Sequence, residues 1–415
     1  MSKRLNSRSP GGRLPGARLL PVLLALAAPL ACDGTGGSGE ARDETPAAAK
    51  ESRADWSPFR RATEAFRATL ETVVEEGDLP GAVAAFVLPD GRVGAASSGQ
   101  ADPEAGSPMN PETRFLAGSV GKTFVAATVF SLALDGSLGL DDPVARHLGK
   151  EPWFADLPNG TSMTVRHLLT HTSGLPDHVG DADFASALVS REDATPYLSP
   201  RELVALVLDE EPLFRPGDGW AYTDTGYVLL GLMVETVTGR DYRDVVRERF
   251  LEPLDLVRTE PQRARMERLA VGYRDPDGSL GLPARMVRGG ALVIDPWTEY
   301  TGGGLVSNPQ DLVRWGRALY EGRAMEGDYL QELLGSAVPI GQGQGIRYGL
   351  GVFIQDTALG TTYGHSGWFP GYRTILAYYP DHGMAVAFQT NTDVDVDLGG
   401  ARDALMSAVL AELES

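Results

Sequence analysis

Cysteine and lysine are scarce in this sequence, and long hydrophobic runs are missing. Among its 415 residues there is one cysteine, Cys32, which excludes a fold held together by internal disulfides. The apolar run from Leu19 to Ala31 is too short to cross a bilayer as a helix. The rest of the composition, 42% hydrophobic and 22% charged, is typical of a globular protein and excludes a disordered or collagen-like chain.

Positive charge is also scarce outside the N-terminus. The chain carries a net charge of −19, and residues 1–31 hold five of its 37 basic residues and no acidic residue. Without that segment the balance is 32 basic against 56 acidic residues, or −24. Phosphate backbones repel so acidic a body, so we expect no nucleic-acid partner, whereas a cationic substrate is compatible with this charge.

The N-terminus has the pattern of an export signal, because basic residues precede the apolar run and Cys32 follows it directly. Residues 28–32, Ala-Pro-Leu-Ala-Cys, resemble a bacterial lipobox, which implies a lipoprotein-type signal peptide over 1–31 and a lipidated Cys32. Pro29 departs from that pattern, and an ordinary secretory signal is the alternative. In both cases we expect an exported protein at the bacterial cell envelope, and in the first case a lipid anchor joins it to the membrane. Residues 32–55 are rich in Gly, Ala and charge and predict a flexible tether.

Strand-like and helical patterns predict the fold of the remaining chain, residues 56–415. Short apolar segments bounded by turn residues predict strands near both ends, at 82–88, 92–98, 374–379 and 384–389. Helical spacing of apolar residues predicts terminal helices at 59–74 and 402–413. The middle of the chain is dominated by helical patterns, at 124–134, 200–208, 227–238, 242–250 and 309–321. We therefore expect one α/β domain of the α+β type, in which an antiparallel sheet is flanked by N- and C-terminal helices and a mostly helical part is inserted at about 120–330.

Ser119 and Lys122 form the first candidate catalytic pair. They are three residues apart, just before the predicted helix at 124–134, so the hydroxyl and the amine face the same way. Serine is a weak nucleophile and needs a nearby proton acceptor, which a desolvated lysine can supply and an arginine cannot. Only four of the 37 basic residues are lysines, so a lysine at this position is informative. Two other patterns are rejected, because Leu116 stands where a phosphate loop has its first glycine and Ala117 where a nucleophile elbow has one.

Two downstream segments complete a pattern in chain order. Tyr222-Thr223-Asp224 opens a predicted helix, and Gly364-His365-Ser366-Gly367-Trp368 precedes the last strands. Ser-x-x-Lys, Tyr-x-Asn and Lys/His-x-Gly in this order resemble the serine β-lactamase and penicillin-binding protein superfamily, in particular its class C β-lactamase and DD-peptidase branch. Further segments typical of that family lie at 79–81, 138–144, 167–175 and 302–307. The resemblance covers about 75–413 and implies a β-lactamase/transpeptidase-like fold.

The resemblance also implies catalytic roles. Ser119 would be the acylated nucleophile, and Lys122 would take part in activating it. Tyr222 would act as general base and acid, with a pKa lowered by Lys122 and the positive field of the site. The backbone N–H groups of Ser119 and Trp368 would form the oxyanion hole.

Substrate contacts are implied for the other matching positions. His365, Ser366 and Gly367 would lie on a strand that lines the pocket, and His365 replaces the lysine of class C β-lactamases. Asp224 departs from the family, which usually has Asn there. Asn donates and accepts hydrogen bonds, whereas an ionised Asp only accepts, so Asp224 would hold Lys122 as a cation or meet a substrate amine.

The remaining histidines have simpler interpretations. His167 and His171 are four residues apart, but Leu168 stands where a zinc protease has its glutamate, and the family uses this segment structurally. His178 lies in a predicted loop, and contact with the pocket rim is the alternative to a purely structural position. No metal and no organic cofactor is implied.

Export and the His-Ser-Gly segment favour a D-alanyl-D-alanine carboxypeptidase-like hydrolase that acts on peptidoglycan-type peptides through an acyl-enzyme. An esterase with the same site is the first alternative, and a class C-type β-lactamase is the second. A non-catalytic penicillin- or peptidoglycan-binding protein is the third, although a binding module would not require Ser119, Lys122 and Tyr222 together. The expected partner is therefore a peptide, ester or β-lactam, and the oligomeric state is left open.

Overall fold

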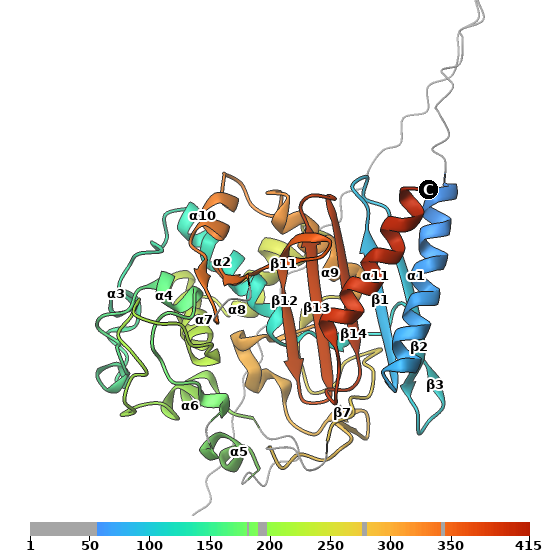
Figure 1. Cartoon of the computed structure of the whole chain (residues 1–415). Helices are drawn as coiled ribbons and strands as arrows, with labels where there is room; N and C mark the ends of the chain where they lie inside the picture. Colours follow the sequence, from blue (N-terminus) through green and yellow to red (C-terminus); the bar gives the residue numbers. More distant parts are fainter. Residues whose placement is uncertain (1–55, 181, 190–196, 276–279, 342–344) are drawn as a thin grey trace, which may run out of the picture. The chain divides into compact units, whose positions relative to one another are not determined.

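A large antiparallel sheet forms the centre of the folded chain (Figure 1). The computed structural model describes residues 56–180, 182–189, 197–275, 280–341 and 345–415, and within these ranges the sheet has nine strands. In order across the sheet they are β3 (Ser107–Pro108), β2 (Val93–Asp102), β1 (Gly81–Val87), β14 (Met384–Thr390), β13 (Tyr372–Tyr379), β12 (Gly360–Phe369), β11 (Phe353–Thr357), β10 (Ile346–Tyr348) and β9 (Val338–Pro339). The predicted signal peptide, Cys32 and the predicted tether lie outside the described residues.

The two ends of the folded chain meet in the middle of this sheet. β1 pairs antiparallel with β2 on one side and with β14 on the other, where Ala84 lies opposite Phe388. Every residue of β1 is buried. Successive side chains of a strand point to opposite faces, so both faces of the sheet must be covered. The predicted antiparallel sheet with strands from both ends of the chain is confirmed.

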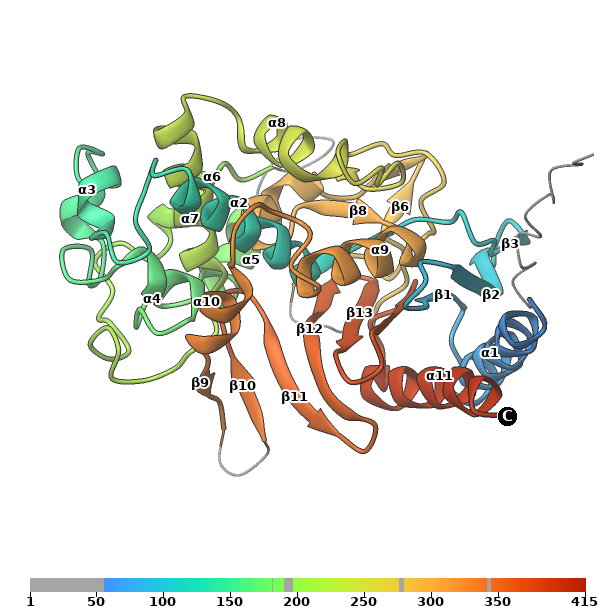
Figure 2. The same cartoon turned by 90° about the horizontal axis from the view of Figure 1, so that it is seen from above.

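Helices from both ends of the chain cover one face of the sheet. α1 (Ser57–Glu76) and α11 (Leu398–Leu413) lie side by side on this face (Figure 2). Phe66 and Leu405 are fully buried between these helices and the sheet. They are the two terminal helices that the sequence predicts, and their apolar faces explain why they dock here.

Helix α9 (Pro309–Tyr320) covers the opposite face (Figure 2) and packs against β1, β13 and β14. Its buried Trp315 stacks on Phe124 with ring centroids 3.9 Å apart, and Trp315 Nε1 donates to Thr123 Oγ1 at 2.8 Å. α9 lies inside the range of about 120–330 that the sequence assigns to the helical part. It nevertheless packs on the sheet, where β1, β13 and β14 cover its one-sided apolar face.

The other helices gather beside the sheet in both views (Figures 1 and 2). They are α2 (Lys122–Leu134), α3 (Val144–Leu148), α4 (Val165–Leu169), α5 (Ala182–Val189), α6 (Pro200–Ala205), α7 (Asp224–Thr238), α8 (Tyr242–Val246) and α10 (Leu330–Gly335). α2 and α7 pack against each other, and most of their residues are buried. The predicted helix at 242–250 is interrupted, because α8 passes into a π-helical turn at Arg247–Leu251.

A small three-stranded sheet leads the chain toward the junction of the two parts. Its order is β4 (Phe115–Leu116), β8 (Leu305–Ser307) and β5 (Glu260–Pro261), and a separate hairpin joins β6 (Val287–Arg288) to β7 (Ala291–Leu292). β4 runs directly into the segment of Ser119, and β8 follows the glycines at 302–304. None of the helices in the described ranges combines the length and the hydrophobicity needed to span a bilayer.

Candidate active site

Ser119 lies in a tight 3₁₀ turn, Gly118–Gly121, between β4 and α2. Gly118 has φ +53°, and a Cβ there would lie 2.7 Å from the backbone N of Trp368 on β12. A Cβ at Gly367 would lie 2.0 Å from the carbonyl oxygen of the residue before the turn and 3.2 Å from the backbone N of Ser119. Only glycine fits at both positions. This close approach brings the backbone N–H groups of Ser119 and Trp368 to the same edge of the site.

The ammonium group of Lys122, the first residue of α2, is fully buried and has three acceptors. Nζ donates to Ser119 Oγ at 3.0 Å, to Asp224 Oδ1 at 2.5 Å and to the carbonyl oxygen of Gly302. An ammonium has three N–H bonds, so each of them finds a partner. The structure therefore brings Ser119 and Lys122 together as the sequence predicts and joins them to Asp224.

Burial and the charge of Asp224 act in opposite directions on Lys122. Removal from water lowers the pKa of Lys122, but the Asp224 carboxylate, together with Tyr222, raises it above the ordinary value of a lysine. Lys122 is therefore a cation in the resting protein and donates to Ser119. The sequence-based expectation of a desolvated lysine with a lowered pKa is therefore wrong, and the alternative in which Asp224 holds Lys122 as a cation agrees with the structure.

Tyr222 reaches the same pair from the loop before α7. Its ring centroid is 4.9 Å from Lys122 Nζ, and its ring packs against that of His171 at 4.2 Å. Its hydroxyl oxygen is buried and has no hydrogen bond of normal geometry among the described residues. Burial raises the pKa of Tyr222 to about 12, because the lowering effect of Lys122 is opposed by the charge of Asp224. The expected lowering of this pKa is therefore wrong, and Tyr222 is a phenol at neutral pH.

Asp224 is the first residue of α7, and a second carboxyl group lies behind it. The backbone N–H of Asp224 donates to Asp177 Oδ1 at 3.0 Å, and that of Val179 donates to the same oxygen at 3.4 Å. Burial, and then the negative charge of Asp224, raise the pKa of Asp177. Of the two sequence-based interpretations of Asp224, the structure contains the contact with Lys122. Asp177 adds a second carboxyl group next to Asp224.

Glu299 and Gly302 belong to the site, although the sequence analysis assigned neither a role there; Gly302 was noted only within the segment 302–307 that is typical of the family. Glu299 Oε2 accepts from Gln262 Nε2 at 2.9 Å and from the backbone N–H of Gly304 at 3.0 Å. A Cβ at Gly303 would lie 2.1 Å from Glu299 Oε1, so the chain passes closely over this carboxyl group. Burial raises the pKa of Glu299 to about 7, although these hydrogen bonds and nearby Lys122 lower it. The signal in the sequence was the run of three glycines, which indicates a close backbone approach.

His365 lies on β12 and faces the site as a neutral imidazole. Its Nδ1 lies 2.6 Å from the carbonyl oxygen of Ser366, and its Nε2 lies 2.9 Å from Tyr348 Oη. A carbonyl oxygen only accepts, so Nδ1 carries the proton and Nε2 accepts from the tyrosine. Burial, and then the charge of Lys122, lower the pKa of His365 to about 3. The position that is a lysine in class C β-lactamases therefore carries no charge here.

The side chains of Ser366 and Trp368 lie on the other face of β12. Ser366 is directly opposite Ile375, which packs in the core beneath α11. Residues directly opposite each other in an antiparallel pair share one face of the sheet, whereas neighbours along a strand alternate. Trp368 Nε1 donates to Asp393 Oδ2 at 3.0 Å. Of this predicted segment, the site therefore receives the side chain of His365, the close approach of Gly367 and the backbone of Trp368.

A small cavity of about 60 Å³ opens beside Asp224. Its apolar part includes Phe184, Leu280 and Phe369, and its acidic part consists of Asp224 and Glu299. His178 also lines it, as one sequence-based alternative proposed, and burial lowers the pKa of that histidine to about 4. No lysine or arginine is among the described residues that line this cavity.

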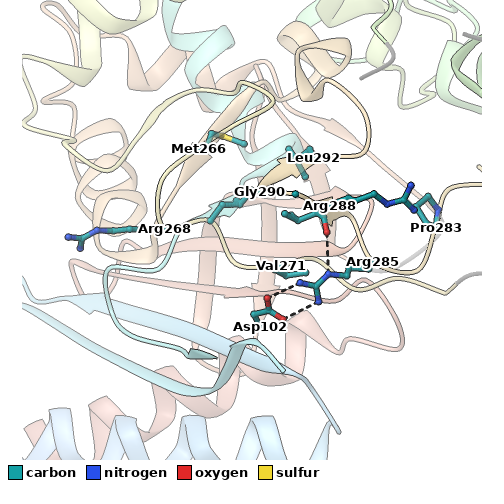
Figure 3. A pocket seen from close by; sticks show the side chains of 12 residues that line it. Asp102, Met266, Arg268, Val271, Pro283, Arg285, Arg288, Gly290 and Leu292 are labelled. Atoms are coloured by element: carbon teal, nitrogen blue, oxygen red, sulfur yellow. Dashed lines mark hydrogen bonds and ion pairs between the residues drawn. The ribbon is translucent and has the colours of Figure 1, made fainter. Parts of the chain in front are cut away.

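A roomier cavity, of about 470 Å³, is lined by arginines and shares no lining residue with the first (Figure 3). Arg285 pairs there with both carboxylate oxygens of Asp102, at 3.0 and 2.8 Å, whereas Arg268 points away from this pair. None of the predicted catalytic side chains lines this cavity. The smaller cavity is lined by Asp224, which holds Lys122 beside Ser119, and by Trp368, so we assign the candidate active site to it.

His167 and His171 have separate contacts and do not form a metal site together. His167 Nδ1 accepts from the backbone N–H of Thr164 in a helix-capping arrangement, and His171 Nδ1 accepts from the backbone N–H of Thr223. Across the described ranges, no group of three or more His, Cys, Asp or Glu side chains is arranged to hold a metal ion.

Comparisons with known proteins point to one family. The Beta-lactamase family model matches residues 66–411. Penicillin-binding protein 4* of Bacillus subtilis (strain 168) is 29% identical over 316 residues, which covers 72% of this chain and 66%, just under two thirds, of that protein. Esterase EstB of Burkholderia gladioli is 31% identical, and the match covers 83% of this chain and 94% of the esterase.

A solved structure gives the same relationship. The D-amino acid amidase of Ochrobactrum anthropi SV3, complexed with L-phenylalanine amide, superposes with a TM-score of 0.70 at 28% identity. The match covers 85% of this chain and 98% of that one. These relatives bear the names of a penicillin-binding protein, an esterase and an amidase, so the choice of substrate depends on the site itself.

We expect Glu299→Gln to change how stability depends on pH. The folded pKa of about 7 lies above the ordinary glutamate value, so the folded state binds more protons than the unfolded state between about pH 4.5 and 7. The free energy of unfolding therefore falls in the wild type as pH rises through this window, and glutamine removes that fall. From pH 5 to pH 8 the variant should gain about 2 kcal/mol relative to the wild type in urea unfolding. Glu326→Gln, at an exposed position, is the matched control. Parallel pH curves for Glu299→Gln and the wild type would contradict the buried, proton-binding state of Glu299.

Proposed function

Because this chain belongs to the Beta-lactamase family and is a serine hydrolase, we propose that it cleaves amides or esters through an acyl-enzyme formed on Ser119. The observation that carries this proposal is the hydrogen bond from Lys122 Nζ to Ser119 Oγ, with the same ammonium paired to Asp224. A nucleophile, a fixed cation and a buried phenol lie together beside a cavity, and acyl transfer needs these parts.

Acylation begins with attack of Ser119 Oγ on the substrate carbonyl carbon. A C–O bond forms, the carbonyl oxygen becomes an oxyanion, and the backbone N–H groups of Ser119 and Trp368 donate to it. The proton of Ser119 passes to the hydroxyl oxygen of Tyr222, which gives its own proton to the departing nitrogen or oxygen as the old bond breaks. Tyr222 is a phenol before and after this step, which agrees with a pKa of about 12.

Deacylation repeats the same transfers with water. The water oxygen attacks the acyl carbon, its proton passes to Tyr222, and Tyr222 returns a proton to Ser119 Oγ as the ester bond breaks. Lys122 remains an ammonium throughout. Its N–H stabilises negative charge as it develops on Ser119 Oγ, and Asp224 holds it in place.

The charges around Ser119 favour a neutral or cationic acyl donor. Lys122 is paired with Asp224, His365 is neutral, and Glu299 adds a carboxyl group to the cavity. A carboxylate on the substrate would lie near these acidic groups and would find no unpaired cation among the described residues that line the cavity. An ammonium group would instead be attracted to the carboxylates in a partly dry site.

An amino acid amide or ester with a free amino group combines the two chemistries that the cavity offers. Its ammonium group would lie toward Asp224 and Glu299, and its apolar side chain toward Phe184 and Leu280. The complex of the D-amino acid amidase with L-phenylalanine amide supports this substrate class, because that ligand carries an amino group and an apolar ring.

Carboxypeptidase activity on D-alanyl-D-alanine peptides, which the sequence analysis favours, is the second candidate function. Similarity to a penicillin-binding protein supports it. Its substrates end in a carboxylate, however, and the acidic surroundings of Ser119 oppose that group. An esterase role is compatible with the proposed site and has support from the similarity to EstB.

The export signal belongs to the same proposal. The basic and apolar pattern of residues 1–31, followed by Cys32, supports an enzyme that is exported and attached to the cell envelope through a lipid on Cys32.

Ser119→Ala should abolish hydrolysis, with a loss of at least about 10³-fold in kcat for p-nitrophenyl butyrate and for phenylalanine amide, because no acyl-enzyme can form. Intact-mass spectrometry after rapid acid quench should detect the acyl adduct in the wild type only. Ser131→Ala, near the C-terminal end of α2, is the matched control and should keep full activity. Normal turnover by Ser119→Ala would overturn the assignment.

The charge preference is tested with phenylalanine amide, which is cationic, and its N-succinyl derivative, which is anionic, each as D and L enantiomers. The two compounds release the same leaving group, so a difference in kcat/KM reports the charge of the acyl part. We expect the wild type to prefer the cationic donor, and Asp224→Asn to shift the ratio of kcat/KM values toward the anionic donor by about tenfold. Asp135→Asn, which makes the same change in an exposed pair with Arg249, should leave the ratio unchanged. A wild type that prefers the succinyl donor would favour the carboxypeptidase function instead.

Lipidation is tested by expressing the full chain in a bacterial host with labelled palmitate. We expect label in the wild-type protein of the membrane fraction, and an unlabelled, soluble Cys32→Ser protein, since the thiol is the acceptor of the lipid. An unlabelled wild type in the soluble exported fraction would favour the ordinary secretory signal.

A further inference from the structure

His171 is a fully buried residue that the proposed reaction does not use. Its backbone has φ +58°, in the left-handed region that few residues other than glycine adopt, although histidine does so more often than most. A strained backbone of this kind costs free energy and persists only where the surrounding structure requires it. The contacts of His171 therefore indicate its role in the structure.

His171 forms hydrogen bonds with the residues immediately before and after Tyr222. The carbonyl oxygen of His171 accepts from the backbone N–H of Ala221 at 3.0 Å, and its Nδ1 accepts from the backbone N–H of Thr223 at 3.2 Å. Between these two contacts the imidazole ring packs on the Tyr222 ring, with centroids 4.2 Å apart and planes inclined by 35°.

The second ring nitrogen of His171, Nε2, is a buried donor without a hydrogen-bond acceptor in the described part of the chain. Because Nδ1 is an acceptor, the proton lies on Nε2. Nε2 is buried and has no hydrogen-bond partner among the described residues. An unpaired buried donor costs free energy. The contacts around Tyr222 offset this cost, together with ring packing against Tyr348 and Tyr227, whose centroids lie 4.7 and 5.1 Å away.

We propose that His171 is a positioning residue that fixes the backbone and ring of Tyr222 so that the phenol hydroxyl stays beside Ser119 and Lys122. The inference rests on the proposed role of Tyr222 as the proton relay. The Tyr222 hydroxyl has no hydrogen bond of normal geometry among the described residues, so its ring and its neighbouring N–H groups hold it. Proton transfer depends on such placement to within a fraction of an ångström.

A positioning role makes a specific prediction about leaving groups. An amide nitrogen must receive the proton that Tyr222 passes on while the C–N bond breaks, whereas a nitrophenolate is stable enough to depart first and to take that proton afterwards. Misplacing Tyr222 should therefore slow amide cleavage far more than cleavage of a nitrophenyl ester. A loss of stability alone would slow both reactions by the same factor.

Two substitutions separate the contacts of His171. His171→Phe keeps an aromatic ring but removes the Nδ1 acceptor, and should lower kcat for phenylalanine amide by about 100-fold and for p-nitrophenyl butyrate by less than about tenfold. His171→Asn tolerates the left-handed backbone and places an oxygen near the Nδ1 position, so it should restore most of the amide turnover. His167→Gln, on the same segment, is the matched control and should behave as the wild type, because glutamine also completes a capping box.

A double-mutant cycle with Tyr222→Phe completes the test, and thermal unfolding of each variant shows that it is folded. In the Tyr222→Phe background the additional loss from His171→Phe should shrink to less than about threefold, because the group that His171 positions is gone. Equal losses for amide and ester, or losses that add fully to those of Tyr222→Phe, would overturn the positioning role. Normal amide turnover by Tyr222→Phe itself would instead overturn the proposed function.

Discussion

The buried ammonium of Lys122 is the contact on which the site depends. It joins the turn of Ser119, the start of α7 at Asp224 and the carbonyl group of Gly302, which are far apart in the sequence. A charge removed from water is tolerated only if its N–H groups and its charge all find partners. Each of the three segments must therefore reach the same point, and the packing of α2 against α7 beside the sheet brings them there.

The same pairing sets the proton positions in the resting enzyme. Asp224 keeps Lys122 charged, and burial keeps Tyr222 a phenol and His365 a neutral imidazole. The lysine is therefore a fixed cation beside Ser119, and Tyr222 is in the phenol state that the proposed proton relay requires. Among the described residues that line the cavity there is no lysine or arginine, and Lys122 is paired with Asp224, so the site is acidic toward a substrate, unlike a pocket built to hold a carboxylate.

Much of the fold could be predicted from the sequence, because its strands and terminal helices have clear local patterns. The hairpin of β1 and β2 and the strands β13 and β14 have apolar runs bounded by turn residues, and α1 and α11 have helical spacing. The packing partner of α9 could not be predicted from the sequence. Its apolar face indicates that it packs on something, but only the tertiary structure selects the sheet over the helical part.

The spacing of Ser119 and Lys122, with the later segments of Tyr222 and His365, predicted from the sequence four residues that the structure brings close together. What those residues do was decided by the tertiary structure. The pKa values of Lys122 and Tyr222 depend on burial and on Asp224, and Glu299 enters the site only because a glycine run folds over it. Residue spacing along the chain governs local geometry, whereas desolvation and charge pairing depend on which distant segments share the same few ångströms of space.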